Sequence, residues 1–244
     1  MRVTRIHTSQ ELHSNAVVQL EPEASRHLSR ALRLGVGDKL ILFNGLGGEY
    51  PAEITALDKR NVQVLTSALA QRECESDLHI HLGIAISRGE RMDWVIQKAT
   101  ELGVSSLTPL MTEHSSGKLA GERAEKKRRH WQKVAVSACE QSGRNRVPDI
   151  HALQALPSWV EDTQAERKFV LHHRATTVST AAKAPKSVAL LIGPEGGLSS
   201  SEIVAAEHAG YESLRLGPRV LRTETAPLAA IAILQGRWGD MLLS

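Results

Sequence analysis

Glycine, proline and one acid end an apolar run in the segment LLIGPEGGLSSSEI, residues 190–203. One turn needs one or two glycines, so the three within 193–197 indicate that the backbone leaves room for something else. The segment 216–226, LGPRVLRTETA, repeats the combination of Gly-Pro with flanking charge. Together the two loops indicate a ligand site more strongly than either does alone. For either loop alone, the glycines can equally serve only to make a turn.

Neither loop matches a nucleotide-binding motif. A Walker phosphate loop requires GxxxxGK[ST], and the stretch GPEGGLS has no lysine. A dinucleotide fingerprint requires GxGxxG after the first strand of an α/β region, and that pattern is also missing. The glycines therefore indicate neither ATP nor NAD.

Positive charge is concentrated in the middle of the chain. Residues 76–150 carry 12 basic and 9 acidic side chains, whereas the residues before and after them are balanced. The densest part of this region is Lys126, Lys127, Arg128 and Arg129. Such a cluster suits phosphates, and a solvated helix face is the alternative interpretation.

Histidine and cysteine give little support for a metal site or a nucleophile. His79 and His81 share one face of a predicted strand, but no third ligand has a supporting spacing. Cys74 and Cys139 form no CxxC pair, and Cys139 lies on an apolar helix face without a histidine partner. We therefore expect no metal, and we interpret Cys139 as a packing residue.

The composition is that of a globular protein. The chain has 244 residues, 41% apolar and 23% charged, which suffices for one large domain or two smaller ones. Aromatic residues make up 3%, which argues against rows of bases stacked on exposed rings. No apolar run approaches 18 residues, and the N-terminus lacks the apolar region of a signal peptide. We expect a cytoplasmic protein.

The first third of the chain has the pattern of short strands. Extended segments at 17–20, 38–44, 50–57 and 61–69 alternate with Gly, Asn and Asp turns, and one helix is predicted over 22–34. These residues indicate a small β-barrel with one helix. The polar segment 70–77 is a candidate linker.

From residue 78 onward, strands alternate with helices. Strands are predicted at 78–86, 104–110, 168–173, 187–192 and 212–216, and helices at 121–142 and 225–238. Capping boxes at Ser87–Glu90 and Ser199–Glu202 predict two further helix starts. This alternation indicates a mostly parallel sheet that is covered on both faces, with ligands beyond the carboxyl ends of its strands.

Four segments carry a resemblance to a known family. They are HLGIAISRGERMDWVIQKATELGVSSLTPL (81–110), KVAVSACEQSGRNRVPDI (133–150), LLIGPEGGLSSSEI (190–203) and LRLGPRVLRTETAPLAAIAILQ (214–235). In this order, and over the whole chain, they resemble the RsmE family of the SPOUT superfamily. These bacterial methyltransferases use S-adenosylmethionine to modify N3 of uridine 1498 in 16S ribosomal RNA.

The resemblance implies an α/β protein with two domains. Residues 1–72 would form a PUA-like β-barrel that binds RNA. Residues 76–244 would form a SPOUT methyltransferase domain that binds S-adenosylmethionine, dimerises and ends in a trefoil knot. The residues by themselves indicate a barrel and a parallel α/β domain but no knot, because threaded chains are rare.

The resemblance also implies a donor site built from three loops. In SPOUT enzymes the methyl donor binds bent, and the backbone holds its adenine, so the glycines would be needed where the ligand lies against the chain. The matching residues are Leu171, His172, Ile192, Gly193, Gly196, Gly197, Leu216, Gly217, Val220, Leu221 and Thr223. SPOUT dimers generally build each site from both subunits, so a homodimer is expected.

Methylation of uracil N3 needs help from charged groups, because N3 is a poor nucleophile until its proton leaves. The enzyme can supply a general base or stabilise charge on O2 and O4. We expect Arg222 to hold the uracil anion and Arg144 to be the cation from the partner subunit. Glu140 and Glu224 are candidate bases, and each can equally be a salt-bridge partner of those arginines. We assign RNA binding to Lys126, Lys127, Arg128, Arg129 and Arg146.

Two other functions remain open from the sequence. A ribose 2′-O-methyltransferase of the same knotted architecture would have the same donor loops. A non-catalytic RNA-binding adaptor would need only a barrel and a basic cluster, and the two glycine-containing loops argue against it.

Overall fold

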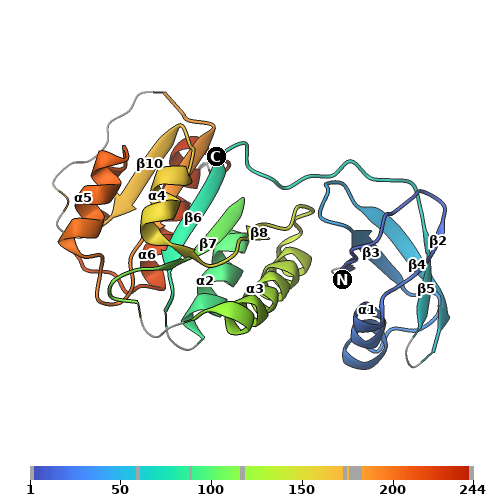
Figure 1. Cartoon of the computed structure of the whole chain (residues 1–244). Helices are drawn as coiled ribbons and strands as arrows, with labels where there is room; N and C mark the ends of the chain where they lie inside the picture. The colour runs from blue at the N-terminus through green and yellow to red at the C-terminus, as the bar shows by residue number, and fades with distance from the viewer. Residues whose placement is uncertain are drawn as a thin grey trace. The chain divides into compact units, whose positions relative to one another are not determined.

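The computed structural model of the chain describes residues 3–58, 61–87, 90–115, 119–172, 175 and 183–241. Its contacts divide the chain into two compact units, both drawn in Figure 1. The first unit contains residues 1–75 and 139–147, and the second contains residues 76–138 and 148–244. Among the described residues, no helix has the length and apolar character needed to cross a membrane. The assignment of 139–147 to the first unit has no signal in the sequence.

A five-stranded sheet forms the first unit. Its strand order is β1-β3-β4-β5-β2, in which β1 and β3 are parallel and the other pairs are antiparallel. The strands are β1 (Thr4–His7), β2 (Val17–Gln19), β3 (Lys39–Phe43), β4 (Tyr50–Leu57) and β5 (Val62–Thr66). Residues of β5 alternate between buried and exposed, so one face of the sheet forms a core that includes Leu40, Leu42 and Ile54.

The helix predicted over 22–34 is shorter in the structure. Helix α1 (Pro22–Arg26) continues as one π-helical turn, η1 (His27–Ala31), which places Leu28 in the core. Arg33 has a positive φ of 54°, a conformation that a helix cannot contain, so the helical segment ends before it. Strand β1 has no counterpart in the sequence-based prediction.

A buried polar cluster joins residues 139–147 to the strands of the first unit. Arg5 forms an ion pair with Glu49, and its Nη2 donates to Oδ1 of Asn145 at 2.5 Å. Burial opposes ionisation of Glu49, but its bonds to Arg5 and Arg72 outweigh that effect and lower the pKa of the carboxyl. Arg144 Nη2 lies 2.6 Å from Glu75 Oε2. Removal of one partner from a buried ion pair leaves an unpaired charge, which is costly in free energy. These pairs therefore hold residues 139–147 in place.

The second unit contains a seven-stranded parallel sheet. Its order is β12-β10-β11-β6-β7-β8, and β9 pairs with β7 further along that strand. The strands are β6 (His79–Ala85), β7 (Ser106–Met111), β8 (Asp149–Ile150), β9 (Gln154–Ala155), β10 (Arg167–Leu171), β11 (Ser187–Ile192) and β12 (Glu212–Leu214). Both the alternation and the parallel pairing confirm the prediction from the sequence.

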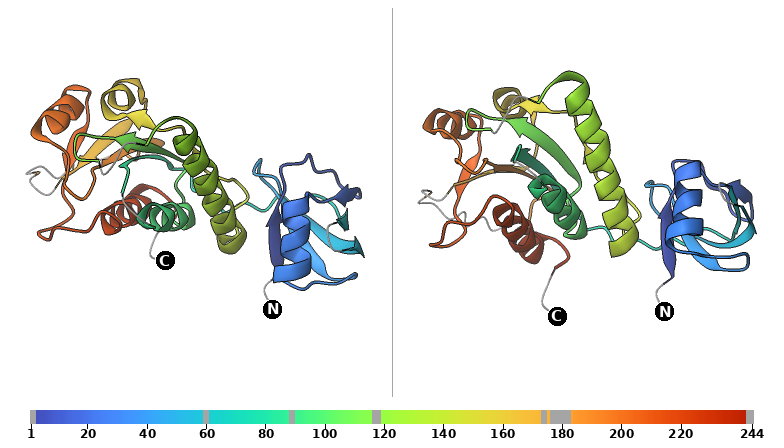
Figure 2. Two further views of the ribbon diagram at one scale, coloured as in Figure 1. Left: turned by 60° about the horizontal axis from the view of Figure 1, so that its bottom comes forward. Right: turned by 90° about the horizontal axis from the view of Figure 1, so that it is seen from below.

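Helices cover both faces of this sheet. They are α2 (Arg91–Glu101), α3 (Gly121–Ser142), α4 (Leu156–Asp162), α5 (Ser200–His208) and α6 (Thr225–Trp238). Figure 2 shows α4 and α5 on one face and α2 and α6 on the other. Trp159 of α4 and Ala206 of α5 share one buried cluster with β10 and β11, while α6 packs against α2.

One of the two capping boxes differs from its prediction. Ser199 and Glu202 form the complete reciprocal pair at the start of α5. Helix α2 begins at Arg91, and its N-cap, Glu90, makes no side-chain capping bond. The helix therefore begins too late for the box predicted at Ser87–Glu90, whose two central residues lie outside the described part of the chain.

Gly83 is required by the packing of α4 on the sheet, and this predicts a steric defect in the variant Gly83→Ala. A Cβ at this position would lie 2.5 Å from ring carbons of Trp159, which is 1% exposed and has no space to withdraw. Overpacking of this kind costs about 1–3 kcal/mol of folding free energy.

The matched control is Gly236→Ala in α6, where the nearest atom to the new Cβ is 3.4 Å away. This change should stabilise the helix by about 0.5–1 kcal/mol. Urea unfolding of the two variants should move the midpoints in opposite directions. Equal midpoints would contradict the packing that we describe.

Candidate functional site

The ends of three neighbouring strands form the floor of a pocket. Leu171 at the end of β10 is in register with Ile192 of β11 on one side and with Leu214 of β12 on the other. Because the strands are parallel, the loops that follow them leave the sheet at the same edge. The end of β10, the loops after β11 and β12, and the start of α5 enclose a pocket of about 500 Å³.

All of the residues that the sequence assigns to the donor site line this pocket. They are Leu171, His172, Ile192, Gly193, Gly196, Gly197, Leu216, Gly217, Val220, Leu221 and Thr223. The family resemblance therefore predicts a set of residues that the fold brings together from three separate segments. The pocket wall also contains His114, which the sequence analysis did not single out.

Each glycine of the loop after β11 has its own structural reason. A Cβ at Gly193 would lie 2.9 Å from the backbone nitrogen of Leu198, so the loop itself excludes a side chain there. Gly197 has a φ of +74° and donates its N–H to the carbonyl of Pro194 at 2.9 Å, which closes a turn. A Cβ at Gly196 would lie 3.2 Å from the Cβ of His114. A Cβ at Gly197 would meet no protein atom within 4 Å, so it would point into open space.

Glu202 ties the start of α5 to the loop after β7. One carboxylate oxygen, Oε2, accepts the N–H of Ser199 at 2.8 Å, and the other, Oε1, accepts the N–H of Glu113 at 2.8 Å. The hydroxyl of Ser201 donates to Glu113 Oε1 at 3.0 Å. Glu202 is 7% exposed, so its two bonds hold the segments together where water has little access, while the bond from Ser201 lies at the surface.

Alternating charges surround the pocket loops. Arg91 of α2 lies 2.5 Å from Glu195 and 3.9 Å from Glu224, through Nη1 and Nε respectively. Arg222 lies 4.0 Å from Glu224, and 81% of its side chain is exposed. Glu224 is therefore a salt-bridge partner of two arginines. From the sequence, this role was the alternative to that of a general base. Arg222 is close to the pocket in sequence but does not contribute to its wall.

Arg144 and Glu140 belong to the first unit, whereas the residues that line the pocket belong to the second. Arg144 is 4% exposed and directs Nε and Nη2 at Glu75. Glu140 accepts the N–H of His7 at 3.0 Å, and burial raises the pKa of its carboxyl. Within one chain, both side chains hold the first unit together, and their catalytic roles remain predictions.

The predicted RNA-binding cluster lies along α3. Lys126, Lys127 and Arg129 are exposed. Arg128 is bound to Glu125 by two hydrogen bonds, of 2.9 Å from Nε and 2.7 Å from Nη2, so it is less available to phosphate. Arg146, in the first unit, lies 4.0 Å from Glu73 and is 57% exposed.

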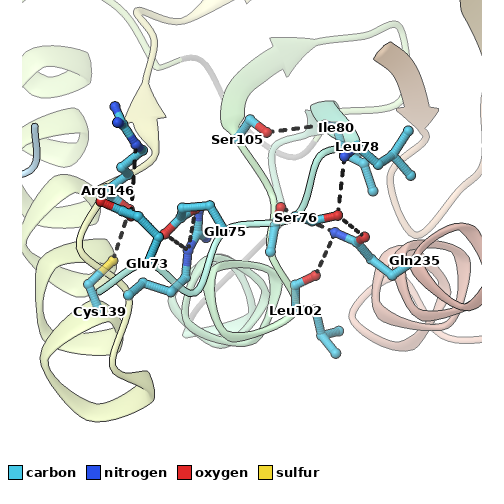
Figure 3. A network of polar contacts seen from close by, with 12 residues as sticks. Glu73, Glu75, Ser76, Leu78, Ile80, Leu102, Ser105, Cys139, Arg146 and Gln235 are labelled. Carbon is cyan, nitrogen blue, oxygen red and sulfur yellow. Dashed lines mark hydrogen bonds and ion pairs between the residues drawn. The ribbon is translucent and has the colours of Figure 1, made fainter. Parts of the chain in front are cut away.

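Cys139 is fully buried, as expected for a packing residue, and His81 has a hydrogen-bond partner within the sheet. His81 Nε2 lies 2.8 Å from the hydroxyl of Thr108, and burial together with nearby His151 lowers the pKa of His81 to about 4. Burial raises the pKa of the Cys139 thiol to about 12, and its sulfur contacts the carbonyl of Arg146 at 3.6 Å (Figure 3). No cluster of three metal-binding side chains occurs in the part of the chain that the structure describes.

Comparison with known families identifies two matching regions. Residues 74–235 match the model of an RNA methyltransferase domain, and residues 20–66 match that of an RNA methyltransferase PUA domain. A relative from Buchnera aphidicola subsp. Schizaphis graminum, named ribosomal RNA small subunit methyltransferase E, is 36% identical over 98% of both chains. A protein of the same name from Bacillus subtilis is 30% identical over 93% of both.

Two solved structures extend these similarities. A putative methyltransferase from Legionella pneumophila, in complex with the cofactor SAM, is 40% identical, with a TM-score of 0.94 over 98% of this chain and 100% of that one. A ribosomal RNA small subunit methyltransferase E from Neisseria gonorrhoeae, bound to S-adenosylmethionine, is 34% identical, with a TM-score of 0.92 over 99% and 100%.

Proposed function

The chain belongs to the family of ribosomal RNA small subunit methyltransferase E, RsmE, and from this premise we propose that it methylates N3 of uridine 1498 in 16S ribosomal RNA. The methyl donor is S-adenosylmethionine, and the substrate is the RNA or the 30S subunit in the cytoplasm. The observation that carries the proposal is the convergence of all the predicted donor residues on one pocket. Relatives of 34% and 40% identity hold S-adenosylmethionine.

The residues that line the pocket suit such a donor chemically. Leu171, Leu216 and Leu221 supply apolar walls for an adenine ring, and the glycine loop supplies main-chain groups for its polar edge. The open space beside Gly197 leaves room for a ligand against the backbone. S-adenosylmethionine supplies a methyl group on a sulfonium, which needs positioning rather than a metal. We assign to Arg222 the task of neutralising charge on the uracil oxygens as N3 loses its proton.

Mass spectrometry of nucleosides tests this function. Ribosomal RNA from cells that lack the protein should contain unmodified uridine at the target position, and purified enzyme with donor should restore N3-methyluridine. A 2′-O-methylated nucleoside would instead identify the ribose methyltransferase alternative. Absence of any change would favour the RNA-binding adaptor.

We also propose the finer features of the fold that the family implies. The first unit would close into a PUA-like barrel that binds RNA, and the C-terminal segment would be threaded as a trefoil knot. The knot is supported by the path of the chain, which pairs β12 with β10 at the sheet edge and then returns to pack α6 against α2. A crystallographic trace of the complete chain tests both features.

A homodimer is the assembly that the exposed apolar surface favours. Trp94 of α2 and Ile233 of α6 are 51% and 55% exposed, and these two helices pack side by side. Large apolar side chains on neighbouring helices favour burial against a second protein surface. Sedimentation that detects only a 26.6 kDa species at micromolar concentration would contradict the dimer.

Replacement of Gly196 should disrupt donor binding. The variant Gly196→Val adds branched carbons where even a Cβ would be 3.2 Å from His114, so they must displace that ring or enter the pocket. We expect affinity for S-adenosylmethionine to fall by about tenfold or more, which corresponds to roughly 1.4 kcal/mol. Calorimetry measures this, with Gly35→Val as the control, since its new Cβ would meet only Asp38 at 3.9 Å. Wild-type affinity in the Gly196 variant would place the donor elsewhere.

RNA affinity and catalysis should be separable. Changing Lys126 and Lys127 to Gln should lower the log–log salt slope of RNA binding by roughly one to two units, without loss of turnover at saturating RNA. Arg128→Gln is the control, because its guanidinium is already bound to Glu125. Arg222→Ala should lower kcat by about 10²–10³-fold with little change in RNA affinity. The opposite pattern in single-turnover assays on 30S subunits would exchange these roles.

A further inference from the structure

A tight turn after β7 presents His114 to the pocket. The N–H of Ser115 donates to the carbonyl of Thr112 at 3.1 Å, and the N–H of Thr112 donates to the hydroxyl of Ser115 at 2.9 Å. These reciprocal bonds enclose residues 113 and 114. The backbone that carries His114 is thus held by its own neighbours.

The same turn is fixed to the pocket loop from the other side. Glu202 accepts the N–H of Glu113, and Ser201 donates to the side chain of Glu113. Through this bond to α5, the position of His114 relative to the glycine loop is set by a buried carboxylate. A group placed so firmly at a pocket wall is preorganised, which is the property that catalytic groups need.

The contact between His114 and Gly197 determines which ring nitrogen carries the proton. His114 Nδ1 lies 3.0 Å from the carbonyl oxygen of Gly197. A carbonyl oxygen can only accept a hydrogen bond, so Nδ1 must be the donor. In a neutral imidazole the other nitrogen, Nε2, then has a lone pair and no proton. The fold therefore selects the tautomer in which Nε2 is a base.

We propose that His114 is the general base of this enzyme and that its Nε2 takes the proton from N3 of the target uridine. This inference rests on the proposed function. The N3–H bond breaks, its electron pair remains on N3 as the nucleophile, and the lone pair of Nε2 forms the new N–H bond. The imidazolium that results is stabilised by the carbonyl of Gly197 and returns its proton to water after turnover.

The carboxylates suggested by the sequence are less suited to this task. Glu140 belongs to the first unit and accepts a backbone N–H there. Glu224 lies within 4.0 Å of both Arg91 and Arg222, so its two carboxylate oxygens are already engaged by arginines. His114 lines the pocket and directs a hydrogen bond at the glycine loop.

The variant His114→Asn isolates the proposed role. The Asn side-chain amide can still donate to the carbonyl of Gly197 in place of Nδ1, but it has no counterpart of Nε2. We expect donor affinity to be unchanged in calorimetry and the single-turnover rate of methylation on 30S subunits to fall by roughly 10²–10⁴-fold. A wild-type rate would overturn the proposal, and so would a matching loss of donor affinity, because that would make His114 only a wall of the pocket.

The pH dependence distinguishes a base from a structural residue. Uridine loses its N3 proton to water as the pH rises, so the deficit of His114→Asn should shrink in alkaline buffer. Other titratable or charged groups that face this region are Glu113, Glu195, Glu202, His172, Arg215 and Arg219, and all of them are present in both proteins. A deficit that is the same at every pH would overturn the proposal.

The tautomer can be measured without donor or RNA. In ¹⁵N-histidine spectra of the intact protein, the resonances missing from His114→Asn identify this ring, and we expect the proton on Nδ1. A proton on Nε2 in neutral protein would overturn the proposal. Nucleoside analysis of the wild-type reaction distinguishes a failure of the proposed function from a failure of the inference about His114. A product other than N3-methyluridine would reject the proposed function and not the tautomer.

Discussion

The pocket depends on one buried carboxylate, that of Glu202. It caps α5 through Ser199 and holds the loop after β7 through Glu113, so its two oxygens serve two different segments. Without it, two backbone N–H groups would lose their acceptors at the pocket wall, and unmatched donors away from water are costly. Strand register brings the loops to one edge of the sheet, and this carboxylate fixes the loop after β7 against the start of α5. The geometry that supports methyl transfer thus begins with a helix cap.

The glycine loop shows how structural and functional demands share the same residues. The loop leaves no space for a side chain at Gly193, whereas Gly197 adopts a left-handed conformation beside open space. Only the second leaves room that a ligand can use. A glycine motif that precedes a helix is thus partly an architectural necessity, and the sequence alone does not separate the two reasons. The structure distinguishes the two reasons, because it places Leu198 of the same turn against Gly193.

Local patterns predicted most of the fold, and long-range contacts account for what they missed. The segments 187–192 and 225–238 are a strand and a helix with the predicted bounds, because each is an almost continuous apolar run between polar or turn residues. Helix α4 was missed because it is short and mixes polar with apolar side chains. Its sequence pattern therefore does not stand out from the other short segments between 150 and 167. The donor residues were found through the resemblance, and the structure gathers them. His114 was missed because a single histidine has no motif, and its hydrogen bond to Gly197 depends on residues 83 positions apart.

The discontinuity of the first unit has a consequence for biosynthesis. Arg5 donates to the side chain of Asn145, and Arg72 donates to the carbonyl of Gly143. Both acceptors are synthesised long after the strands of the first unit. A ribosome that has released only residues 1–75 has therefore released an incomplete unit, in which Arg5 and Arg72 have Glu49 but still lack their acceptors at Asn145 and Gly143. The usual order, in which an N-terminal domain folds before the next is synthesised, is not open to this chain. Its first unit becomes complete only after residues 76–138 of the second unit, about two-fifths of that unit, have been synthesised. The folding of the two units must therefore overlap in time.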